Sequence, residues 1–379
     1  MYDVVVVGGG IGGLTVAALL SARGLNTCLL ERQSQVGGCI GRVEFSGFDF
    51  EPGMGLYTSF GPGGIYEKLF SELPVELPEV SLLTSPHIMR LADGTDVKLD
   101  TGELYSIAGG PASLAERLAE SIKKSGGAVR LDTPVLRLSY DESGAATGVD
   151  LLSGERVFAK KAIVSNLTIW DTYGKLVGLN RTPSEIRKRL NTLKGTGVYV
   201  IYASIEEPAV TRLPSEHMLV RDNAGEFTLA ISGKRAVTFT TRTDVEPWFS
   251  YQTSEEDYEE WDQSALEQFW NRVHAALPEL GSDVEIIETA NPRTYYDLMR
   301  RKLGMVLGLE QDTEPLSHRT SLPNLFMVGD TISPTATLNT IVQSAVAVTK
   351  EIIWQDYQDL QDWHLIMKDP GNPVQKTRH

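Results

Sequence analysis

The sequence predicts an α/β fold in which a buried parallel sheet, covered by helices, is interrupted by a long α+β insertion. The chain begins with a β-branched run, Val4 to Val7, that leads through glycines into a helical pattern. A second buried run, Leu325 to Val328, comes near the other end. Continuous apolar runs of this length are typical of parallel strands covered on both faces. Between the two runs, residues 167–295 alternate between strand-like and helical patterns, which indicates a second unit inserted into the first.

The first run is followed by the spacing G-x-G-x-x-G at Gly8, Gly10 and Gly13. In such a turn the first glycine permits the bend, the second lets a pyrophosphate approach the backbone, and the third lets the helix pack on the strand. The helical pattern begins at Ile11 and ends at Gly24, which we expect to cap it. Free N–H groups at the helix start then face the phosphates. The motif predicts a dinucleotide-binding turn rather than a glycine-rich turn without a ligand.

An acidic residue ends the next strand pattern, which covers Thr27 to Leu30. Glu31 is in the position from which a carboxylate binds the ribose hydroxyls of an adenosine and repels a 2′-phosphate. Further small residues follow at Gly37-Gly38 and around Gly53. Because such residues let backbone approach a flat ligand, we prefer a second contact zone for the same cofactor over a pair of ordinary loops.

The composition bounds the class of protein. The 379 residues suit about two or three domain-sized units, and 22% charged with 41% hydrophobic residues is ordinary for a folded chain. A net charge of -15 argues against a nucleic-acid partner and against attraction to anionic lipid. Because the first strand starts at Tyr2 and no run is long enough to cross a bilayer, we expect no targeting peptide, no transmembrane segment and a cytoplasmic location. Peripheral membrane contact and the oligomeric state are left open.

Metal chemistry is not predicted. Cys28 and Cys39 form neither a disulfide framework nor a metal spacing, and the six histidines are scattered, so we expect no metal. Cys39 directly follows the Gly-Gly pair, where it would be a small packing residue or else a redox or covalent partner of the cofactor. We favour the packing role.

These segments together resemble the FAD-dependent phytoene desaturase and flavin amine oxidase superfamily, in particular its phytoene dehydrogenase-related branch. The resemblance implies FAD as the cofactor and a Rossmann-type FAD-binding domain, similar to that of glutathione reductase, with an inserted α+β substrate domain. It implies that Glu31 binds the adenosine ribose. It also implies that five further residues line the cofactor: Arg32, Gly37, Gly38, Glu51 and Gly53.

Later segments extend the resemblance. A strand beginning at Val135 would meet the adenine through its backbone, and Ser165 and Asn166 would lie near the cofactor at the end of a returning strand. Gly329-Asp330 follows the second buried run, and in the family this aspartate binds the diphosphate–ribityl region. The next helix, about 339–353, would point its N-terminus at the isoalloxazine, where positive potential stabilises reduced flavin.

The resemblance also divides the chain. It assigns residues 1–80, 105–166 and 296–355 to the FAD-binding domain, and residues 81–104 and 167–295 to the substrate domain. Residues 356–379 are expected to form a C-terminal extension with a disordered end. An aromatic stripe within residues 258–273 is expected to be core rather than a substrate site.

The substrate cannot be identified from the sequence, and no catalytic side chain stands out. Arg293 and Tyr295, in the segment that returns to the flavin, are candidates for substrate contact, and a purely structural role is equally open. Ser333 to Asn339 stands where the desaturases usually carry several glycines after the aspartate. Added side chains there put the family's substrate passage in question.

Three functions follow from the resemblance. The leading one is an FAD-dependent desaturase or oxidase that moves a hydride from a C–H bond of an apolar, isoprenoid- or carotenoid-like compound to flavin N5. The second is a flavin amine oxidase. The third is a non-catalytic FAD-containing binding or assembly protein, which the altered segment after Asp330 motivates. The direction of the reaction and the electron acceptor are left open.

Overall fold

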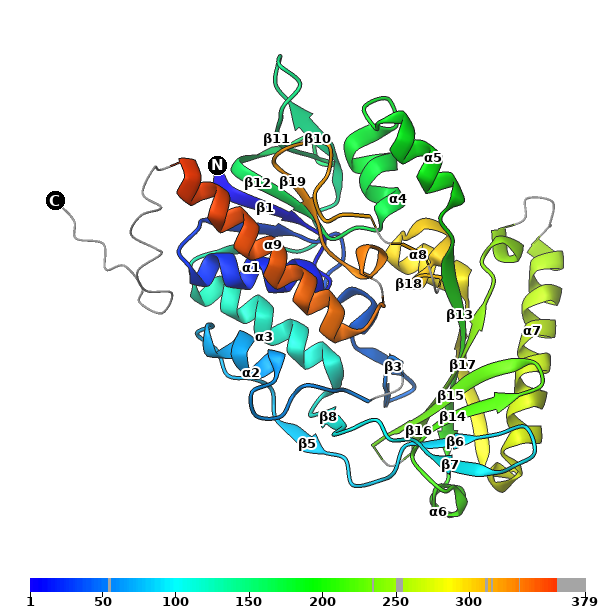
Figure 1. The fold of residues 1–379 in the computed structure, drawn as a ribbon. Helices are drawn as coiled ribbons and strands as arrows, with labels where there is room; N and C mark the ends of the chain where they lie inside the picture. Colours follow the sequence, from blue (N-terminus) through cyan, green and yellow to red (C-terminus); the bar gives the residue numbers. More distant parts are fainter. Residues whose placement is uncertain are drawn as a thin grey trace.

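The computed structural model describes residues 1–53, 56–233, 235–249, 255–310, 313–314, 316–333 and 335–359. Pro334, in the segment expected to differ from the desaturases, and residues 360–379 of the expected C-terminal extension lie outside the described residues. The described chain forms two large sheets, each packed against helices (Figure 1). The α/β fold class predicted from the sequence is confirmed.

The first sheet contains seven strands. They are β1 (Tyr2–Val7), β2 (Thr27–Leu30), β9 (Ala128–Arg130), β10 (Val135–Tyr140), β11 (Ala146–Leu151), β12 (Arg156–Ser165) and β19 (Leu325–Met327). Their order is β10-β11-β12-β1-β2-β9, with β19 also paired to β12. The pairs β1–β2, β1–β12 and β12–β19 are parallel, whereas β10 and β11 form an antiparallel extension. Parallel strands of this kind bring their carboxyl ends, and the loops that follow, to one edge.

Three helices cover one face of this sheet: α1 (Ile11–Ala22), α3 (Gly110–Lys124) and α9 (Leu338–Asp359) (Figure 1). α1 contacts both other helices and is buried from Ile11 to Ser21, which explains why it has no charged face. A Cβ atom at Gly13 would lie 2.2 Å from the carbonyl oxygen of Gly8. Only glycine therefore permits α1 to pack this closely on β1.

The opposite face of the first sheet is covered by a second helical group. It consists of α4 (Ile169–Asp171), the π-helical turn η2 (Thr172–Gly178) and α5 (Ser184–Thr192). Ile169, Tyr173 and Leu176 pack with Val5 and Ile163 of the sheet in one buried core. The first sheet is thus covered on both faces, as its continuous apolar strands predict.

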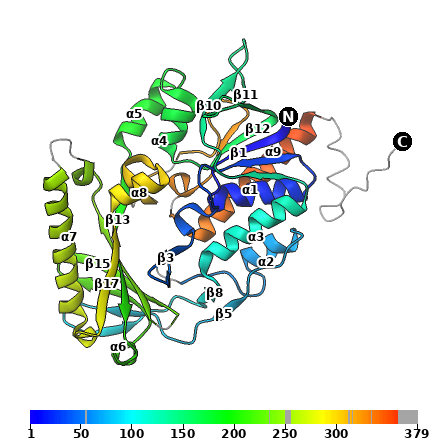
Figure 2. The same cartoon turned by 180° about the vertical axis from the view of Figure 1, so that it is seen from behind.

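The second sheet contains eight strands. They are β6 (Ile88–Arg90), β7 (Asp96–Lys98), β13 (Gly195–Ile205), β14 (His217–Asp222), β15 (Gly225–Ser232), β16 (Ala236–Thr243), β17 (Val284–Ala290) and β18 (Val306–Leu309). Alternate residues of β13 face opposite sides of the sheet. Tyr199 and Ile201 pack in the core beneath α7 (Glu255–Ala276), whereas Val200 and Tyr202 belong to the core on the other face. Figure 2 shows α7 along the outer side of this sheet.

The aromatic stripe of α7 is core only in part. Phe269 and Val273 are buried, and Tyr258 and Ala265 pack against the same core. Trp261, expected to join them, is 48% exposed. Its ring lies edge-on to Trp248, with 6.2 Å between the centroids. The prediction is therefore wrong for Trp261, which covers the edge of the core instead of filling it.

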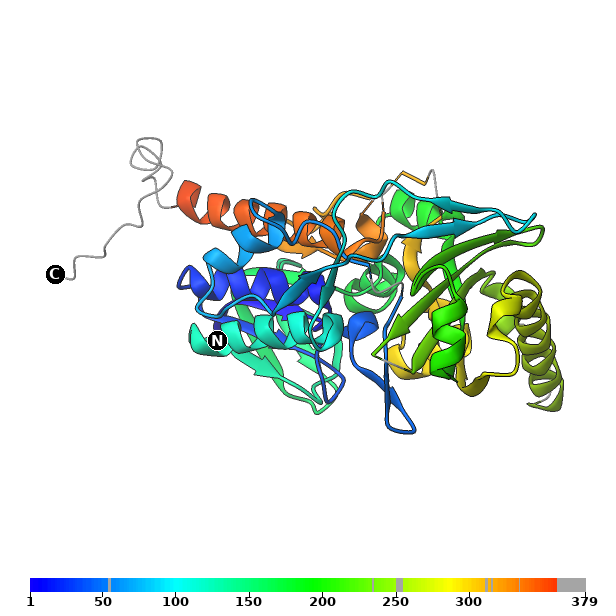
Figure 3. The same cartoon turned by 90° about the horizontal axis from the view of Figure 1, so that it is seen from below.

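We propose that the two sheets mark the two domains, with bounds that differ from the sequence-based division at two places. β18 pairs with β13 in the second sheet, although residues 296–355 were assigned to the first domain. The helices within residues 169–192 pack on the first sheet, although the sequence assigned them to the second domain. Figure 3 shows the first sheet with its helices on one side and α7 at the opposite end.

The remaining elements connect these layers. They are the hairpins β3 (Val43–Phe45) with β4 (Phe48–Phe50) and β5 (Val80–Leu82) with β8 (Tyr105–Ile107), the helices α2 (Ile65–Ser71), α6 (Glu207–Arg212) and α8 (Pro292–Met299), and the short turns η1 (Gly38–Ile40), η3 (Glu246–Phe249), η4 (Pro278–Leu280), η5 (Lys302–Gly304) and η6 (Asp330–Ile332). Among the helices that the structure describes, none has the length and apolar character needed to cross a membrane.

Candidate active site

A cavity of about 630 Å³ lies between the two sheets. One wall is built by the β1–α1 turn, the end of β2, the η1 loop and the ends of β12 and β19; the other is built by β13, β16, β18 and α8. Of the residues predicted from the sequence, twelve line it: Gly8, Gly10, Glu31, Arg32, Gly37, Gly38, Gly53, Val135, Asn166, Tyr295, Gly329 and Asp330. Segments far apart in the chain therefore meet at one site.

The β1–α1 turn forms a cradle of bare backbone at one end of the cavity. Gly8 has φ +99°, a conformation that side chains other than glycine rarely adopt. A Cβ atom at Gly10 would lie 2.5 Å from Nδ2 of Asn166. Gly10 is also the N-cap of α1 and provides no side-chain cap, so the first N–H groups of the helix are open to a ligand. This cradle fits a diphosphate.

Glu31 lies beside the cradle. Its Oε2 accepts the backbone N–H of Gly9 at 2.5 Å, and its Oε1 accepts the backbone N–H of Gln33 at 2.7 Å. A carboxylate has about four lone-pair sites, so both oxygens can still accept hydroxyl groups. The residue thus combines a fixed orientation with free capacity for the hydroxyls of a ribose.

The second glycine pair lies directly against the first. The N–H of Gly37 donates to the carbonyl oxygen of Gly9 at 2.8 Å, and Gly37 forms a parallel bridge with Gly10. Gly37 and Gly38 both have positive φ, +110° and +57°. The loop that the sequence suggested as a second contact zone is thus continuous with the cradle, and η1 carries it toward the second sheet.

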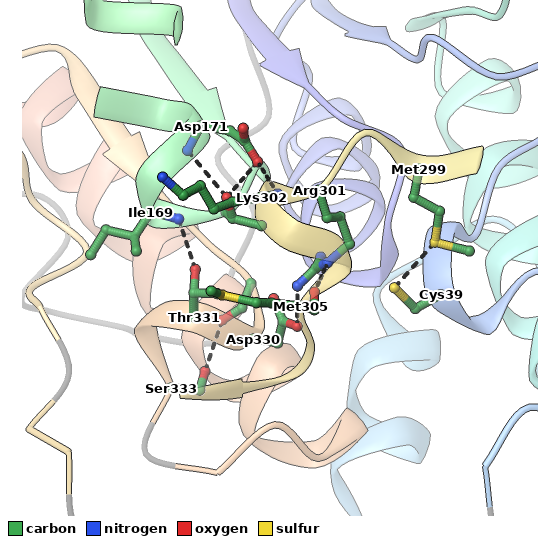
Figure 4. A network of polar contacts seen from close by, with 12 residues as sticks. Cys39, Ile169, Asp171, Met299, Arg301, Lys302, Met305, Asp330, Thr331 and Ser333 are labelled. Atoms are coloured by element: carbon green, nitrogen blue, oxygen red, sulfur yellow. Dashed lines mark hydrogen bonds and ion pairs between the residues drawn. The ribbon is translucent and has the colours of Figure 1, made fainter. Parts of the chain in front are cut away.

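At the same carboxyl edge of the first sheet, Gly329 and Asp330 follow β19. Oδ2 of Asp330 pairs with Nη2 of Arg301 at 2.5 Å, and both side chains are largely buried (Figure 4). Nε of Arg301 donates to the carbonyl oxygen of Met305. Burial would lower the pKa of Arg301, but the Asp330 carboxylate outweighs it and raises that pKa. A fixed cation therefore lies beside the aspartate at the cavity wall.

The last residues of α8 and those that follow it contact several walls of the cavity. The carbonyl oxygen of Leu298 accepts hydrogen bonds from the side chains of Arg32 and Gln33. Next along the chain, Sδ of Met299 lies 3.4 Å from Sγ of Cys39 (Figure 4). Beyond the Arg301–Asp330 pair, the N–H of Lys302 donates to Oδ2 of Asp171 at 3.2 Å. Residues 298–302, which we call the crossing segment, thus join α8 to the η1 loop, to η6 and to α4.

Four predicted residues do not line the cavity. Gly13 packs α1 on the strand, as described above. Ser165 is fully buried, and its Oγ shares a hydrogen bond with Oγ1 of Thr172 at 2.8 Å, away from the cavity. Arg293 is exposed and holds its guanidinium 4.3 Å from the ring centroid of Tyr258. Its cation–π contact with α7 explains why it does not reach the site.

Glu51 is the fourth of these residues. Its Oε1 accepts the hydroxyl of Tyr57, and burial raises the pKa of Glu51 despite that hydrogen bond. Tyr57 itself lines the cavity, so Glu51 acts one residue removed from it. The role that the resemblance implies for Glu51 stays a proposal.

The wall from the second sheet contains residues that the sequence interpretation did not single out. They are Val198, Val200 and Tyr202 of β13, Thr238 and Thr240 of β16, and Val306 and Leu307 of β18. Alternation along β13 would have grouped 198, 200 and 202 on one face. It would not have shown which face meets the cavity, because Tyr199 and Ile201 on the other face are apolar as well.

The glycine cradle, the acidic Glu31 beside it and the adjoining cavity together define a dinucleotide-dependent protein of the Rossmann class. A family model described as flavin containing amine oxidoreductase matches residues 89–353, and a model of an NAD(P)-binding Rossmann-like domain matches residues 6–73. The chain belongs to the flavin containing amine oxidoreductase family. It is an FAD-dependent oxidoreductase, which confirms the cofactor and class that the resemblance implied.

Curated relatives are similar over part of their length. A chloroplastic prolycopene isomerase from Daucus carota is 25% identical over 255 residues, which cover 60% of this chain and 40% of the relative. A carotenoid 3,4-desaturase from Haloarcula japonica is 42% identical over 69 residues, or 18% of this chain and 13% of the relative. The chain thus spans well under two thirds of the relatives it matches.

Solved structures share the fold over nearly the whole chain. An oxidoreductase from Methanosarcina mazei superposes with a TM-score of 0.70 at 16% identity, covering 92% of this chain and 99% of that one. A putrescine oxidase variant gives a TM-score of 0.67 at 12% identity, covering 93% and 99%. At such low identity the likeness concerns the fold alone.

Proposed function

We propose that this protein removes a hydride from a C–H bond of an uncharged, apolar substrate and transfers it to the flavin of FAD, as a desaturase or oxidase. The observation that carries the proposal is the apolar wall from the second sheet, which faces the glycine cradle across one cavity. Val198 and Val200 of β13 and Val306 of β18 contribute to it. Apolar surface of this kind favours an isoprenoid or a similar hydrocarbon skeleton.

The acids of the cavity argue for an uncharged substrate. Among the described lining residues, the carboxylates are Glu31, Asp171 and Asp330. Glu31 accepts two backbone N–H groups, Asp330 pairs with Arg301, and Asp171 pairs with Lys175 at 2.7 Å. The second-sheet wall adds no carboxylate. A substrate ammonium group buried there would lack a partner, which is costly. This weighs against a flavin amine oxidase.

FAD supplies the hydride acceptor, and the chain supplies its placement. In this proposal the cradle at Gly8 and Gly10 holds the diphosphate, Glu31 holds the adenosine ribose, and Asp330 meets the ribityl part. The other predicted cofactor-binding residues that line the cavity are proposed to contact FAD as well. The second-sheet wall then excludes water from the reacting carbon.

The carotenoid-related names of several relatives are consistent with an isoprenoid substrate. A cytoplasmic location, with peripheral contact to membranes as the source of apolar substrate, stays part of the proposal.

The test is to mix the FAD-loaded protein with candidate substrates without oxygen and to monitor reduction of the flavin as a loss of its absorbance. We expect isoprenoids to bleach the flavin and putrescine to leave it oxidised. Bleaching by putrescine but by no isoprenoid would show an amine oxidase instead. A flavin that dithionite reduces but that no organic donor reduces would support the non-catalytic binding or assembly protein.

A further inference from the structure

Two tyrosine hydroxyls stand out in the apolar second-sheet wall. Tyr202 comes from β13 and Tyr295 from α8, and both residues line the cavity. Each side chain contributes to the pKa shift of the other, so the two hydroxyls are neighbours. Elements separated by a long stretch of sequence therefore place two hydroxyl groups together at one point of the wall.

Packing fixes this pair beside the cofactor loop. The ring of Tyr202 packs on Phe45 and Phe50 of the β3–β4 hairpin, with centroid distances of 5.3 Å and 5.0 Å. Tyr295 and Cys39 pack against the same apolar core. Because Cys39 directly follows Gly38, the pair lies where the glycine loop meets the second sheet. A group bound by these hydroxyls is therefore close to the junction of cofactor and substrate.

Both hydroxyls stay protonated. Burial raises the pKa of Tyr202, and it raises the pKa of Tyr295 well above its ordinary value. The neighbouring Tyr202 and Cys39 raise the pKa of Tyr295 further. The pair has two hydroxyl hydrogens, and a hydrogen bond between the two hydroxyls would use only one of them. One O–H donor is left over at every physiological pH.

That remaining donor needs an acceptor. In the part of the chain that the structure describes, no hydrogen bond is formed by either hydroxyl, and the neighbouring side chains Val198, Val200 and Val306 offer no acceptor. The Thr238 hydroxyl, on the residue directly opposite Tyr202, is itself without a hydrogen-bond partner among the described residues. A donor that faces an apolar cavity is unfavourable when a bound ligand excludes water and offers no acceptor, and polar groups in such pockets normally fix the orientation of a ligand. The acceptor is therefore expected on the substrate.

Building on the proposed function, we propose that the substrate is an apolar molecule with one oxygen function, a hydroxyl or a carbonyl, which the Tyr202–Tyr295 pair binds by donating a hydrogen bond. A bare hydrocarbon would leave the donor unpaired. A protonated amine would also leave it unpaired, because an ammonium group has no lone pair to accept with. The pair thus determines specificity and sets which part of the substrate faces the flavin.

The test compares geranylgeraniol with the matching hydrocarbon in which hydrogen replaces the hydroxyl. Binding to the FAD-loaded protein is measured from the perturbation of the flavin absorption spectrum after dithionite has reduced the flavin, so that no hydride transfer can follow. We expect the wild type to bind the alcohol about tenfold more tightly than the hydrocarbon. Tyr295→Phe and Tyr202→Phe should each remove most of this preference while leaving hydrocarbon affinity within about twofold, because only the hydroxyl is lost.

Two further variants sharpen the result. The double variant should lose no more preference than either single one, because the hydroxyls act as a unit. Tyr199→Phe is the matched control: it makes the same change on the same strand, but Tyr199 faces the core beneath α7 and bonds Asp262 at 3.2 Å. It should keep the wild-type preference.

The outcomes separate this inference from the proposed function. Equal affinity of the wild type for both probes, or an unchanged preference in both Tyr→Phe variants, would overturn the role of the pair while leaving an apolar substrate in place. If isoprenoids neither perturb nor reduce the flavin in any variant, the proposed function itself fails and the inference fails with it.

Discussion

The guanidinium of Arg301 lies 2.5 Å from the carboxylate of Asp330, and this pair joins the crossing segment to the end of the first sheet. The partners are 29 residues apart and expose only 15% and 17% of their side chains. An ion pair so little exposed is a poor source of net stability, but breaking it leaves an unpaired charge. The crossing segment is therefore held at the cavity wall by an ion pair, and removal of either partner should destabilise the protein.

Arg301→Met tests that contact. It removes the cation, leaves Asp330 largely buried and unpaired, and should lower the free energy of unfolding of the FAD-loaded protein by about 3 kcal/mol. Urea unfolding followed by tryptophan fluorescence measures the change. Arg300→Met is the matched control, because the Arg300 side chain is 54% exposed and pairs with Asp297 only at 3.5 Å. The free energy of unfolding of this control should stay within about 0.5 kcal/mol of that of the wild type. Equal losses of stability in Arg301→Met and Arg300→Met would contradict the structural role of the Arg301–Asp330 pair.

Gly13→Ala tests the packing of the first helix. The added Cβ would lie 2.2 Å from the Gly8 carbonyl oxygen, so α1 must move away from β1 and distort the cradle. We expect a loss of about 1–3 kcal/mol of stability and a purified protein with less than stoichiometric FAD. The cofactor content follows from the ratio of flavin to protein absorbance. Gly174→Ala, where no atom lies within 4 Å of the added Cβ, should retain FAD.

Local signals made the FAD-binding part of the fold predictable. The strand at Val4 to Val7, the cradle glycines and Glu31 follow one another within a short stretch, and their geometry depends on neighbours in sequence.

The second wall of the site was not predictable because it depends on tertiary contacts. Both faces of β13 are apolar, so the sequence does not tell which residues line the cavity. In residues 291–302 the sequence pointed to Arg293, whereas Arg300 and Arg301 line the cavity. Only the fold brings Arg301 to Asp330, and only the fold turns Arg293 onto the ring of Tyr258.

Cys39 provides a test of how FAD is held. Burial raises the pKa of the Cys39 thiol, and its Sγ lies 3.4 Å from Sδ of Met299. A protonated, half-buried thiol is a poor nucleophile, so we expect no covalent bond to the flavin. Heat or acid denaturation should release all the FAD into the supernatant, where its absorbance is measured. A precipitate that stays yellow would contradict this packing role for Cys39.

The stability of the protein should fall in mild acid because of His217. Burial, with a contribution from nearby His87, lowers the pKa of His217 to about 4, and the residue is only 7% exposed. An unfolded histidine has a pKa of about 6.5, so the unfolded state binds the proton first as the pH falls. The buried neutral histidine therefore contributes its full stabilisation above pH about 6.5. As the pH falls from about 6.5 to about 4, the free energy of unfolding decreases by about 2–3 kcal/mol.

His217→Gln removes this titration, so its free energy of unfolding should fall less steeply than that of the wild type in this pH window. Urea unfolding at a series of pH values measures both slopes. Carboxylates such as Asp150 contribute to stability only where they are ionised. Hydrogen bonds from Ser139 and from two arginines lower the pKa of Asp150 to about 2, so this contribution is lost only in stronger acid. Their effect therefore falls mostly below the histidine window. Parallel curves for the wild type and His217→Gln between these limits would show that burial of His217 is relieved before the protein unfolds.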